Sequence, residues 1–338
     1  MTSQSSAVRE PDARERCRAI TSSQRRCRNF AIDERGFCRI HAGPRKGSLP
    51  APPERRPPEA VLEERVRQFM EFFQRRVTGD YTVDDLGFDE ELTDQIFHPI
   101  AMAFYRHYWR VTAIGIENVP MTGPAMLVSN HSGTVPWDGV MLQFGLREEH
   151  PARRTLRLVG ADLVYQFPFI SHLSRKSGNV HANADDALRL LRNGELVGVF
   201  PEGYKGVGKP FGQRYRLQRF GRGGFVEIAL KSRVPIIPVA ITGAEEIYPM
   251  IANLKPLARL FGFPYFPITP FFPALGPLGA LPLPTKWMIE FGDPIPTEHL
   301  PADAHEDTMM IFDVADQVRD RIQQMINRNL AARRGIFR

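Results

Sequence analysis

The chain lacks an unbroken apolar run long enough to cross a membrane. A spanning helix needs about 20 consecutive apolar residues, and prolines, glycines or charges interrupt the longer hydrophobic stretches of this 338-residue chain. Residues 1–30 also lack the apolar core of a secretory signal and are polar and rich in arginine instead. We therefore expect no transmembrane helix, and a cytoplasmic protein that works peripherally on the inner face of the membrane.

The main part of the chain also lacks an excess of charge of either sign. The formal net charge is +6 at pH 7, and residues 1–60 alone contain 13 Lys or Arg against 7 Asp or Glu. That surplus accounts for the whole excess, so the high isoelectric point describes an N-terminal arm. A nucleic-acid partner is therefore not expected for the main domain.

What the chain does contain is a regular alternation of short apolar runs and helical segments. Its length and its hydrophobic content of 43% fit one large α/β domain with small appendages. The alternation predicts a mostly parallel sheet flanked by helices. The expected strands are 125–128, 156–159, 196–200, 235–241 and 287–291, and the expected helices are 60–77, 92–109, 185–192, 223–232 and 305–332.

Composition divides the chain into four parts. Residues 1–42 hold all three cysteines, and residues 43–60 are dense in proline and predict an extended linker. Residues 61–110 carry amphipathic helices, and residues 111–338 form the α/β domain. We expect the catalytic chemistry in this last part.

One loop of the α/β domain pairs an imidazole with a carboxylate. Residues 129–139 read Ser-Asn-His-Ser-Gly-Thr-Val-Pro-Trp-Asp-Gly and follow the apolar run 125–128. A strand that ends here gives His131 a rigid base, and Asp138 can hold one ring nitrogen so that the other accepts a proton. The pattern favours a general base that activates a hydroxyl. The alternative is a surface histidine in a turn rich in glycine and proline.

A second polar loop follows the strand expected at 196–200. Residues 199–206 read Val-Phe-Pro-Glu-Gly-Tyr-Lys-Gly. Loops at the carboxyl ends of parallel strands build the sites of α/β folds. We expect Glu202 to bind an acceptor hydroxyl or to hold a neighbouring base in place, and Lys205, Lys209 and Arg214 to neutralise a phosphate. A solvated loop with ordinary surface charges is the alternative.

Three ordered blocks carry a resemblance to a known family. They are Asn130-His131 with Asp138, then Phe200-Pro201-Glu202-Gly203, then Val234-Pro235-Ile236-Ile237-Pro238-Val239. In this order they resemble the blocks of the glycerolipid and lysophospholipid acyltransferase superfamily, such as the 1-acylglycerol-3-phosphate O-acyltransferases. The resemblance implies acyl transfer from acyl-CoA or acyl carrier protein to a hydroxyl of a glycerophosphate or lysophospholipid, without a covalent acyl-enzyme. It also implies that His131 is the catalytic base, Asp138 its partner, and Glu202 with Gly203 the acceptor-binding block.

Two features depart from the usual pattern of that superfamily. Six residues, instead of four, separate His131 from Asp138. The usual arginine-bearing block is not clear, and residues 174–180, which include Arg175, occupy its place. Because these departures weaken the expectation of a phosphate on the acceptor, the alternative acceptor is a diacylglycerol, a long-chain alcohol or an aminolipid.

The chemistry of the residues agrees with acyl transfer. A hydroxyl must lose its proton as it attacks, and a neutral imidazole held in one tautomer by a carboxylate removes that proton. The thiolate of a thioester leaves readily, so a general base and oxyanion donors suffice. We expect the backbone amides near Ser132 and Gly133 to be those donors, and Lys205 and Arg175 to contact the substrate.

No cofactor is expected for catalysis beyond acyl-CoA or acyl carrier protein as co-substrate. A metal-dependent hydrolase is not expected either, because no second cluster of His, Asp and Glu at ligand spacing accompanies His131. The expected partners are therefore the thioester donor, a lipid acceptor and a membrane surface.

Residues 247–285 are rich in aromatic residues and proline. They include Pro264-Tyr265-Phe266-Pro267-Ile268-Thr269-Pro270-Phe271-Phe272-Pro273, which is too broken to span a bilayer as a helix. The segment suits a surface insertion near an acyl-chain tunnel, with Lys255, Arg259 and Lys286 facing anionic headgroups. The alternative is an irregular loop that covers the core.

The N-terminal arm has the spacing of a small metal-binding module. Cys17, Cys27, Cys38 and His41 follow the pattern Cys-x9-Cys-x10-Cys-x2-His, which supplies four ligands for a tetrahedral structural zinc ion. Because this arm is too short to bury a core of its own, zinc binding would provide its folding energy. The run also resembles small Cys3His knuckle-like modules of unknown role. The alternative is a disordered basic tail with free thiols.

A membrane-surface O-acyltransferase of glycerolipid type is therefore the leading prediction. A different class of function is a zinc-dependent interaction protein whose α/β domain only binds lipid. The loss of His131 or Glu202 would have favoured that class, and both residues are present.

Overall fold

The computed structural model of the chain describes residues 17–19, 58–132, 135–160, 165 and 168–338. Gly133 and three of the predicted zinc ligands, Cys27, Cys38 and His41, lie outside these residues. Cys17 lies inside them and is buried. The chain divides into two compact units, Met1–Val66 and Arg67–Arg338. The domain boundaries inferred from composition stay predictions.

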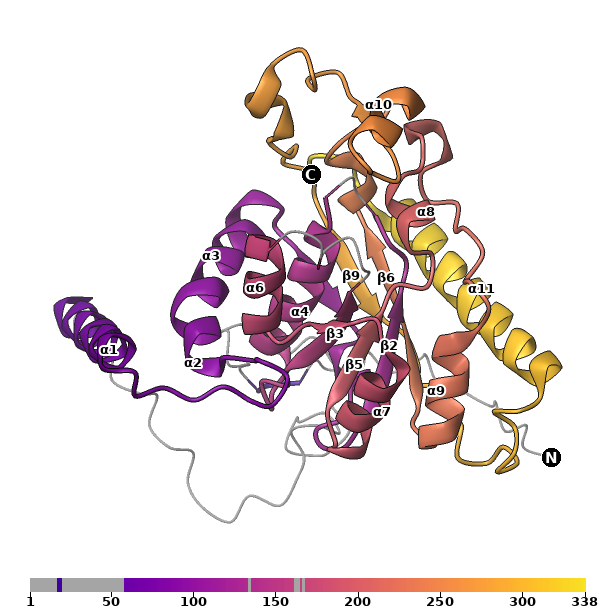
Figure 1. Cartoon of the computed structure of the whole chain (residues 1–338), viewed down its shortest axis with the longest axis horizontal. Helices are drawn as coiled ribbons and strands as arrows, with labels where there is room; N and C mark the ends of the chain where they lie inside the picture. Colours follow the sequence, from indigo (N-terminus) through magenta and orange to yellow (C-terminus); the bar gives the residue numbers. More distant parts are fainter. Residues whose placement is uncertain (1–16, 20–57, 133–134, 161–164, 166–167) are drawn as a thin grey trace, which may run out of the picture. The chain divides into compact units, whose positions relative to one another are not determined.

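A seven-stranded sheet lies at the centre of the second unit, in the order β1-β9-β6-β2-β5-β3-β4 (Figure 1). Neighbouring strands run parallel, except that β6 and β9 run antiparallel. The expectation of a mostly parallel α/β sheet is therefore confirmed. The strands are β1 (Thr112–Ile114), β2 (Ala125–Ser129), β3 (Leu156–Gly160), β4 (Val180–His181), β5 (Leu196–Val199), β6 (Ile236–Thr242) and β9 (Met288–Phe291).

The central strands β2 and β6 are buried along their whole length because helices cover both faces of the sheet. One core joins these strands to α7 (Ala184–Arg192), α9 (Gly224–Ser232) and α11 (Thr308–Ala332). The other core joins them to α4 (Trp137–Glu149) and to the helical run before the sheet (Figure 1).

The helices expected from the periodicity of the sequence are present. The helix predicted over 60–77 is α1 (Pro58–Thr78), and the one predicted over 92–109 is an uninterrupted helical run from Glu90 to Tyr108. Helices α7, α9 and α11 confirm the other three. The run contains two π-helical turns and consists of α2 (Glu90–Leu92), η1 (Thr93–Phe97), α3 (His98–Ala103) and η2 (Phe104–Tyr108).

Sequence periodicity missed the longer helices α4 and α6 (Pro168–Lys176), and the short edge strands β1 and β4. Helix α4 is buried along most of its length, so its residues show no separate polar face. It also contains two glycines, and the Tyr105 ring packs directly against Gly145. A segment that is buried on most sides, and that contains glycine, carries no clear helical period to detect.

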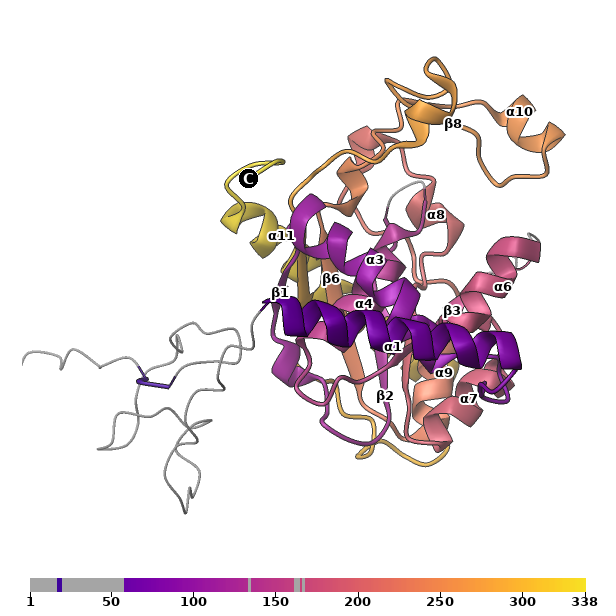
Figure 2. The same ribbon diagram turned by 90° about the vertical axis from the view of Figure 1, so that its left-hand side faces the viewer.

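The segment 247–285 follows β6 and lies at the end of the sheet where β2, β5 and β6 terminate (Figures 1 and 2). It is built from short elements, which are β7 (Ala252–Asn253), α10 (Lys255–Leu260), β8 (Pro267–Ile268) and η6 (Gly276–Ala280). Strands β7 and β8 form a separate antiparallel pair. The remaining short helices are η3 (Ile116–Asn118), α8 (Tyr204–Val207), η4 (Phe211–Gln213) and η5 (Ala244–Glu246).

Among the described residues, no helix combines the length and the apolar composition that crossing a membrane requires. The long helix α1 is amphipathic instead. Its apolar side chains, Phe69, Met70, Phe73 and Val77, recur at helical spacing and are each exposed by 45% or more.

Candidate active site

The two polar loops leave the same edge of the sheet. Strands β2 and β5 are parallel neighbours, with Val128 opposite Val199, so the residues that follow them emerge side by side. His131 follows β2 by two residues, and Glu202 follows β5 by three. The carboxyl edge of the central strands is therefore where the predicted site residues meet.

Asp138 holds the imidazole of His131. The Nδ1 atom of His131 lies 2.7 Å from Oδ2 of Asp138, and the Asp138 side chain is fully buried in the first turn of α4. Because a carboxylate only accepts hydrogen bonds, the neutral form of this imidazole has its proton on Nδ1 and a lone pair on Nε2. His131 and Asp138 therefore form the predicted pair, although six residues separate them in the chain.

Two backbone amides fix the Asp138 carboxylate in turn. Oδ2 accepts a hydrogen bond from the Ser132 N–H at 2.7 Å, and Oδ1 accepts one from the Gly139 N–H at 2.8 Å. The Ser132 amide is therefore already used and does not point at an oxyanion, as the sequence-based prediction for this residue assumed. Gly133, the other predicted donor, lies outside the described residues.

The His131 ring is confined on its sides. It stacks on the Phe200 ring, with 4.6 Å between ring centroids and 29° between ring planes. Gly206 of α8 approaches so closely that a Cβ atom there would lie 2.9 Å from the His131 carbonyl oxygen. The side chain of His131 keeps 16% of its surface exposed. The imidazole is thus held in one orientation but stays accessible.

Glu202 lies directly behind the His131 loop. Its Oε1 accepts a hydrogen bond from the His131 backbone N–H at 3.0 Å, and its Oε2 accepts one from the Gln218 backbone N–H at 2.6 Å. The Glu202 side chain is fully buried. Of the two roles expected for Glu202, this geometry suits holding the base in place, since both carboxylate oxygens are occupied.

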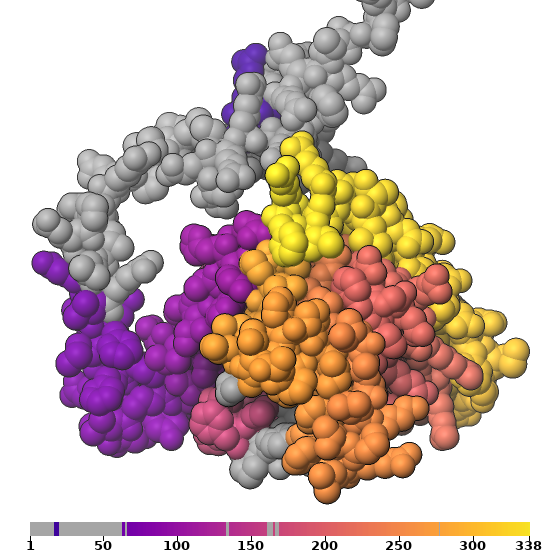
Figure 3. Space-filling model, turned by 90° about the horizontal axis from the view of Figure 1, so that it is seen from above, coloured from indigo at the N-terminus to yellow at the C-terminus, as the bar shows by residue number. Residues whose placement is uncertain are grey.

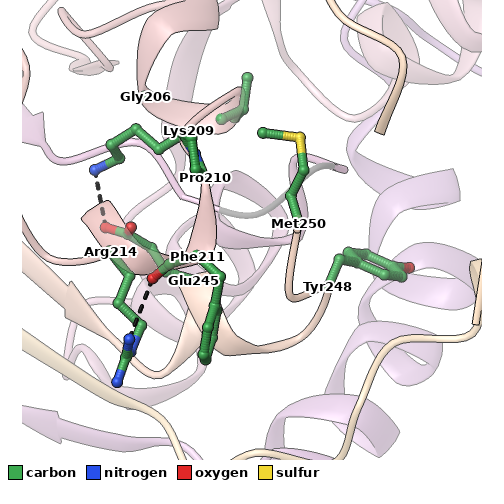
Figure 4. Close-up of a pocket in the computed structure, with 9 residues that line it drawn as sticks. Gly206, Lys209, Pro210, Phe211, Arg214, Glu245, Tyr248 and Met250 are labelled. Atoms are coloured by element: carbon green, nitrogen blue, oxygen red, sulfur yellow. Dashed lines mark hydrogen bonds and ion pairs between the residues drawn. The ribbon is translucent and has the colours of Figure 1, made fainter. Parts of the chain in front are cut away.

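Lys209 connects Glu202 to a second buried carboxylate, which the sequence did not indicate. Its Nζ lies 3.0 Å from Oε1 of Glu245 (Figure 4). The same Nζ lies 3.5 Å from Oε2 of Glu202. All three side chains are 5% exposed or less, so Lys209 is not free to meet a phosphate as predicted. Burial raises the pKa of Glu245 to about 7, against the opposing effect of Lys209. The pairing spans 36 residues, so no local pattern signals it.

The other predicted substrate contacts lie around this centre. Gly203 has a positive φ of 55°, which favours glycine at the turn into α8. Lys205 is exposed on α8. The guanidinium of Arg214 lies over the Phe211 ring, at 4.2 Å from its centroid, beside the small hollow lined by Lys209 and Glu245.

Arg175 is not brought to His131 by the described contacts. It is exposed near the end of α6, and its guanidinium lies 5.7 Å from the centroid of the Tyr165 ring. Its Cβ faces the backbone of Gly87, in the loop before α2. The segment that occupies the place of the usual arginine block therefore makes other contacts in the described part of the chain.

Asn130 is a site residue whose part the sequence did not reveal. Its buried amide donates to the carbonyl oxygen of Ile241 at 3.0 Å and accepts from the Ile241 N–H at 2.7 Å. It thereby continues the pairing of β2 with β6 by one step, immediately before His131. An asparagine amide suits this position because it offers a donor and an acceptor like a peptide group.

Among the residues that the structure describes, no group of three or more His, Cys, Asp or Glu side chains is placed to hold a metal ion. The predicted zinc site lies almost wholly outside those residues and stays a prediction. The described centre consists of an imidazole, its carboxylate partner, and a buried cluster that holds the backbone of His131.

The chain is similar to proteins whose names describe an activity. A bovine (Bos taurus) protein named "DGAT1/2-independent enzyme synthesizing storage lipids" is 26% identical over 216 residues, which are 64% of this chain and 58% of that protein. The crystal structure of the 1-acyl-sn-glycerophosphate (LPA) acyltransferase PlsC from Thermotoga maritima matches with a TM-score of 0.46 and 18% identity, and covers 73% of this chain and 84% of that one.

More similar relatives come from mycobacteria. The uncharacterized protein Rv0502 of Mycobacterium tuberculosis is 53% identical over 79% of this chain and 74% of that protein. The uncharacterized protein ML2427 of Mycobacterium leprae is 51% identical over 83% and 76%, respectively. Residues 110–242, which contain His131, Asp138 and Glu202, match the family model described as Acyltransferase. The chain therefore belongs to one family with these mycobacterial proteins and carries an acyltransferase domain.

Proposed function

We propose that the protein transfers a fatty acyl group from a thioester donor, acyl-CoA or acyl carrier protein, to a hydroxyl of a lipid acceptor. The observation that carries the proposal is the 2.7 Å contact between His131 Nδ1 and the fully buried carboxylate of Asp138. This contact leaves Nε2 as the ring nitrogen with a lone pair, in a residue that is partly exposed. A general base in this arrangement suits an acceptor that must lose a proton as it attacks.

In the proposed reaction the acceptor oxygen attacks the thioester carbonyl carbon while Nε2 of His131 takes the hydroxyl proton. The C–S bond of the tetrahedral intermediate then breaks, and Nε2 returns the proton to the departing thiolate. The products are an ester and a free thiol. Asp138 stabilises the transient imidazolium and keeps the ring in its orientation.

The leading acceptor class is a glycerophosphate or lysophospholipid, as the resemblance implies. A neutral acceptor such as a diacylglycerol is the second candidate. It is favoured by the pairing of Lys209 with two carboxylates and by the contacts of Arg175 with Tyr165, which leave both cations engaged. The name of the bovine relative, which refers to storage lipids, points the same way.

The test of the reaction uses purified full-length protein, a labelled long-chain acyl-CoA and a mixture of acceptors, with lipid products identified by mass spectrometry. We expect His131→Ala to lower acyl transfer about 10²–10⁴-fold, the range of general-base catalysis. His299→Ala, at an exposed histidine of the same unit, is the matched control and should keep wild-type activity. Near-normal transfer by His131→Ala would refute the proposed base.

A further inference from the structure

We infer that the segment 247–285 is the surface by which the protein docks on an anionic lipid membrane, directly over its catalytic loop. This inference rests on the proposed function, because it supplies the place where a lipid acceptor enters. Four observations carry it: exposed apolar side chains, an absence of acidic residues, the backbone of the segment and its position.

The segment exposes an unusual number of large apolar side chains. Six of them are more than half exposed, with exposed fractions from 55% for Leu275 to 75% for Leu260. Exposed apolar side chains gathered in one segment are costly in water and mark sites where another phase or partner covers them. The six residues are Ile251, Leu260, Phe261, Leu275, Leu278 and Leu281.

The charges of the segment favour an anionic lipid surface over other partners. No Asp or Glu occurs between Glu246 and Glu290, although the chain has 38 acidic residues. Lys255 and Arg259 lie on α10 and are exposed, one turn from the exposed Leu260 and Phe261. Apolar side chains next to cations, without any acid, match the boundary between acyl chains and anionic headgroups.

Lys286 does not belong to this surface, although the sequence suggested that it would. Its ammonium donates to the carbonyl oxygen of Arg110 and, at 2.7 Å, to Oγ1 of Thr112. Burial lowers the pKa of Lys286. The cations available to headgroups on the described segment are therefore those of α10.

The backbone of the segment suits shallow insertion. Helix α10 has six residues, and prolines interrupt the chain on both sides of β8. Such a segment cannot cross the hydrocarbon core, because unpaired backbone groups would be left there. Its apolar tips can enter the headgroup region to the depth of about 5–10 Å that interfacial segments reach.

The segment also lies next to the loop that follows Glu202. The backbone N–H of Phe211 donates to the carbonyl oxygen of Met250 at 2.8 Å, and the Tyr265 ring packs against Gly208. Burial and the nearby charge of Asp138 together raise the pKa of Tyr265 to about 12. Figure 3 looks down on this face, where the segment forms the orange surface. A lipid held by its chains in the bilayer would therefore present its hydroxyl close to His131.

The experiment measures binding of the full chain to sucrose-loaded vesicles of phosphatidylcholine, with and without about 30% phosphatidylglycerol. We expect Leu260→Ser with Phe261→Ser to weaken binding about tenfold or more, because two apolar side chains are lost from the interface. Lys255→Gln with Arg259→Gln should remove most of the preference for phosphatidylglycerol. Met121→Ser with Met309→Ser, at exposed apolar positions elsewhere, is the matched control and should bind like wild type.

A second measurement locates the surface without weakening it. Phe261→Trp should be quenched by phospholipids with brominated chains, and Met309→Trp should not. Wild-type vesicle binding by the Leu260→Ser and Phe261→Ser double variant, absence of quenching at position 261, or burial of the segment in a dimer of this chain would overturn the inference. Acyl transfer to detergent-solubilised acceptor by wild-type protein is measured in parallel, so that failure of the reaction is separate from failure of docking.

Discussion

The Glu202 carboxylate accepts a hydrogen bond from the backbone N–H of His131, with 3.0 Å between Oε1 and the nitrogen. Glu202 thus fixes the main chain of His131, whereas Asp138 fixes its side chain. Two carboxylates from different loops therefore set the position and the tautomer of one imidazole. Because Glu202 and Asp138 hold different parts of His131, variants of the two residues can be told apart.

Glu202→Gln should lower kcat and leave KM for the acceptor almost unchanged. An amide has one acceptor oxygen, so either the His131 N–H or the Gln218 N–H loses its partner, at a cost of about 1–3 kcal/mol of stability. A displaced base lowers kcat about tenfold or more. Steady-state kinetics with varied acceptor decide the matter, with Glu227→Gln on the exposed face of α9 as the control. A large rise in KM with kcat preserved would instead assign Glu202 to acceptor binding.

Gly206→Ala should impair both folding and activity. The added Cβ would lie 2.9 Å from the His131 carbonyl oxygen and 3.0 Å from the His131 Cβ, so the loop that carries His131 must shift. We expect a loss of about 1–3 kcal/mol in the free energy of unfolding, as for other overpacked sites. Gly212→Ala, where a Cβ meets no atom within 4 Å, is the matched control for urea unfolding and for acyl transfer. Equal behaviour of the two variants would contradict the close approach of α8.

Glu245 should make the stability of the protein depend on pH. Its pKa is raised from 4.5 to about 7 in the folded chain, chiefly by burial, so the folded state keeps a proton that the unfolded state releases in this range. This contribution to stability is present below about pH 4.5 and is lost as the pH rises to about 7, with a size on the order of 1–3 kcal/mol.

The Glu245→Gln variant isolates this contribution. Other carboxylates titrate in both proteins, so the quantity to follow is the difference in unfolding free energy between wild type and Glu245→Gln. Urea unfolding at pH 5, 6, 7 and 8 should show wild type losing stability relative to the variant between pH 5 and 7. A constant difference across this range would mean that Glu245 is ionised throughout.

The predicted zinc module is tested by metal analysis of the full chain. We expect one zinc ion per chain when all three cysteines are intact, and none in Cys27→Ser with Cys38→Ser, because thiolate ligands provide most of the affinity. Inductively coupled plasma mass spectrometry measures the zinc content, and thiol titration before and after addition of a chelator measures the free cysteines. Zinc near zero in the wild-type chain would favour the alternative of free thiols.

The strands of the sheet were predictable because both of its faces are covered. Runs such as 125–128 and 235–241 are continuously apolar, and this pattern is local. The direction of β9 was not predictable, since the same four residues fit a parallel or an antiparallel pairing with β6. Helix α4 escaped detection for the related reason that burial on most sides removes its polar face.

At the site, the sequence indicated which loops meet. It did not indicate which side chains of these loops contact one another. His131 and Asp138 stand close in the chain, so their pairing was visible in advance. The link from Glu202 through Lys209 to Glu245 depends on where η5 lies after β6, and Asn130 pairs with a residue 111 positions away. Such contacts are products of the tertiary fold, and single-sequence patterns do not contain them.

The contact of Asp138 with Nδ1 also bears on the direction of the proposed reaction. With that nitrogen occupied and the ring held against Phe200, the proton taken from the acceptor must leave through the atom that received it. Each turnover then ends with the enzyme in its starting ionisation, because the thiolate takes up the proton that the acceptor released. The same atoms serve the reverse step, in which a thiol attacks an ester, so the supply of thioester and free thiol sets the direction of acyl flow.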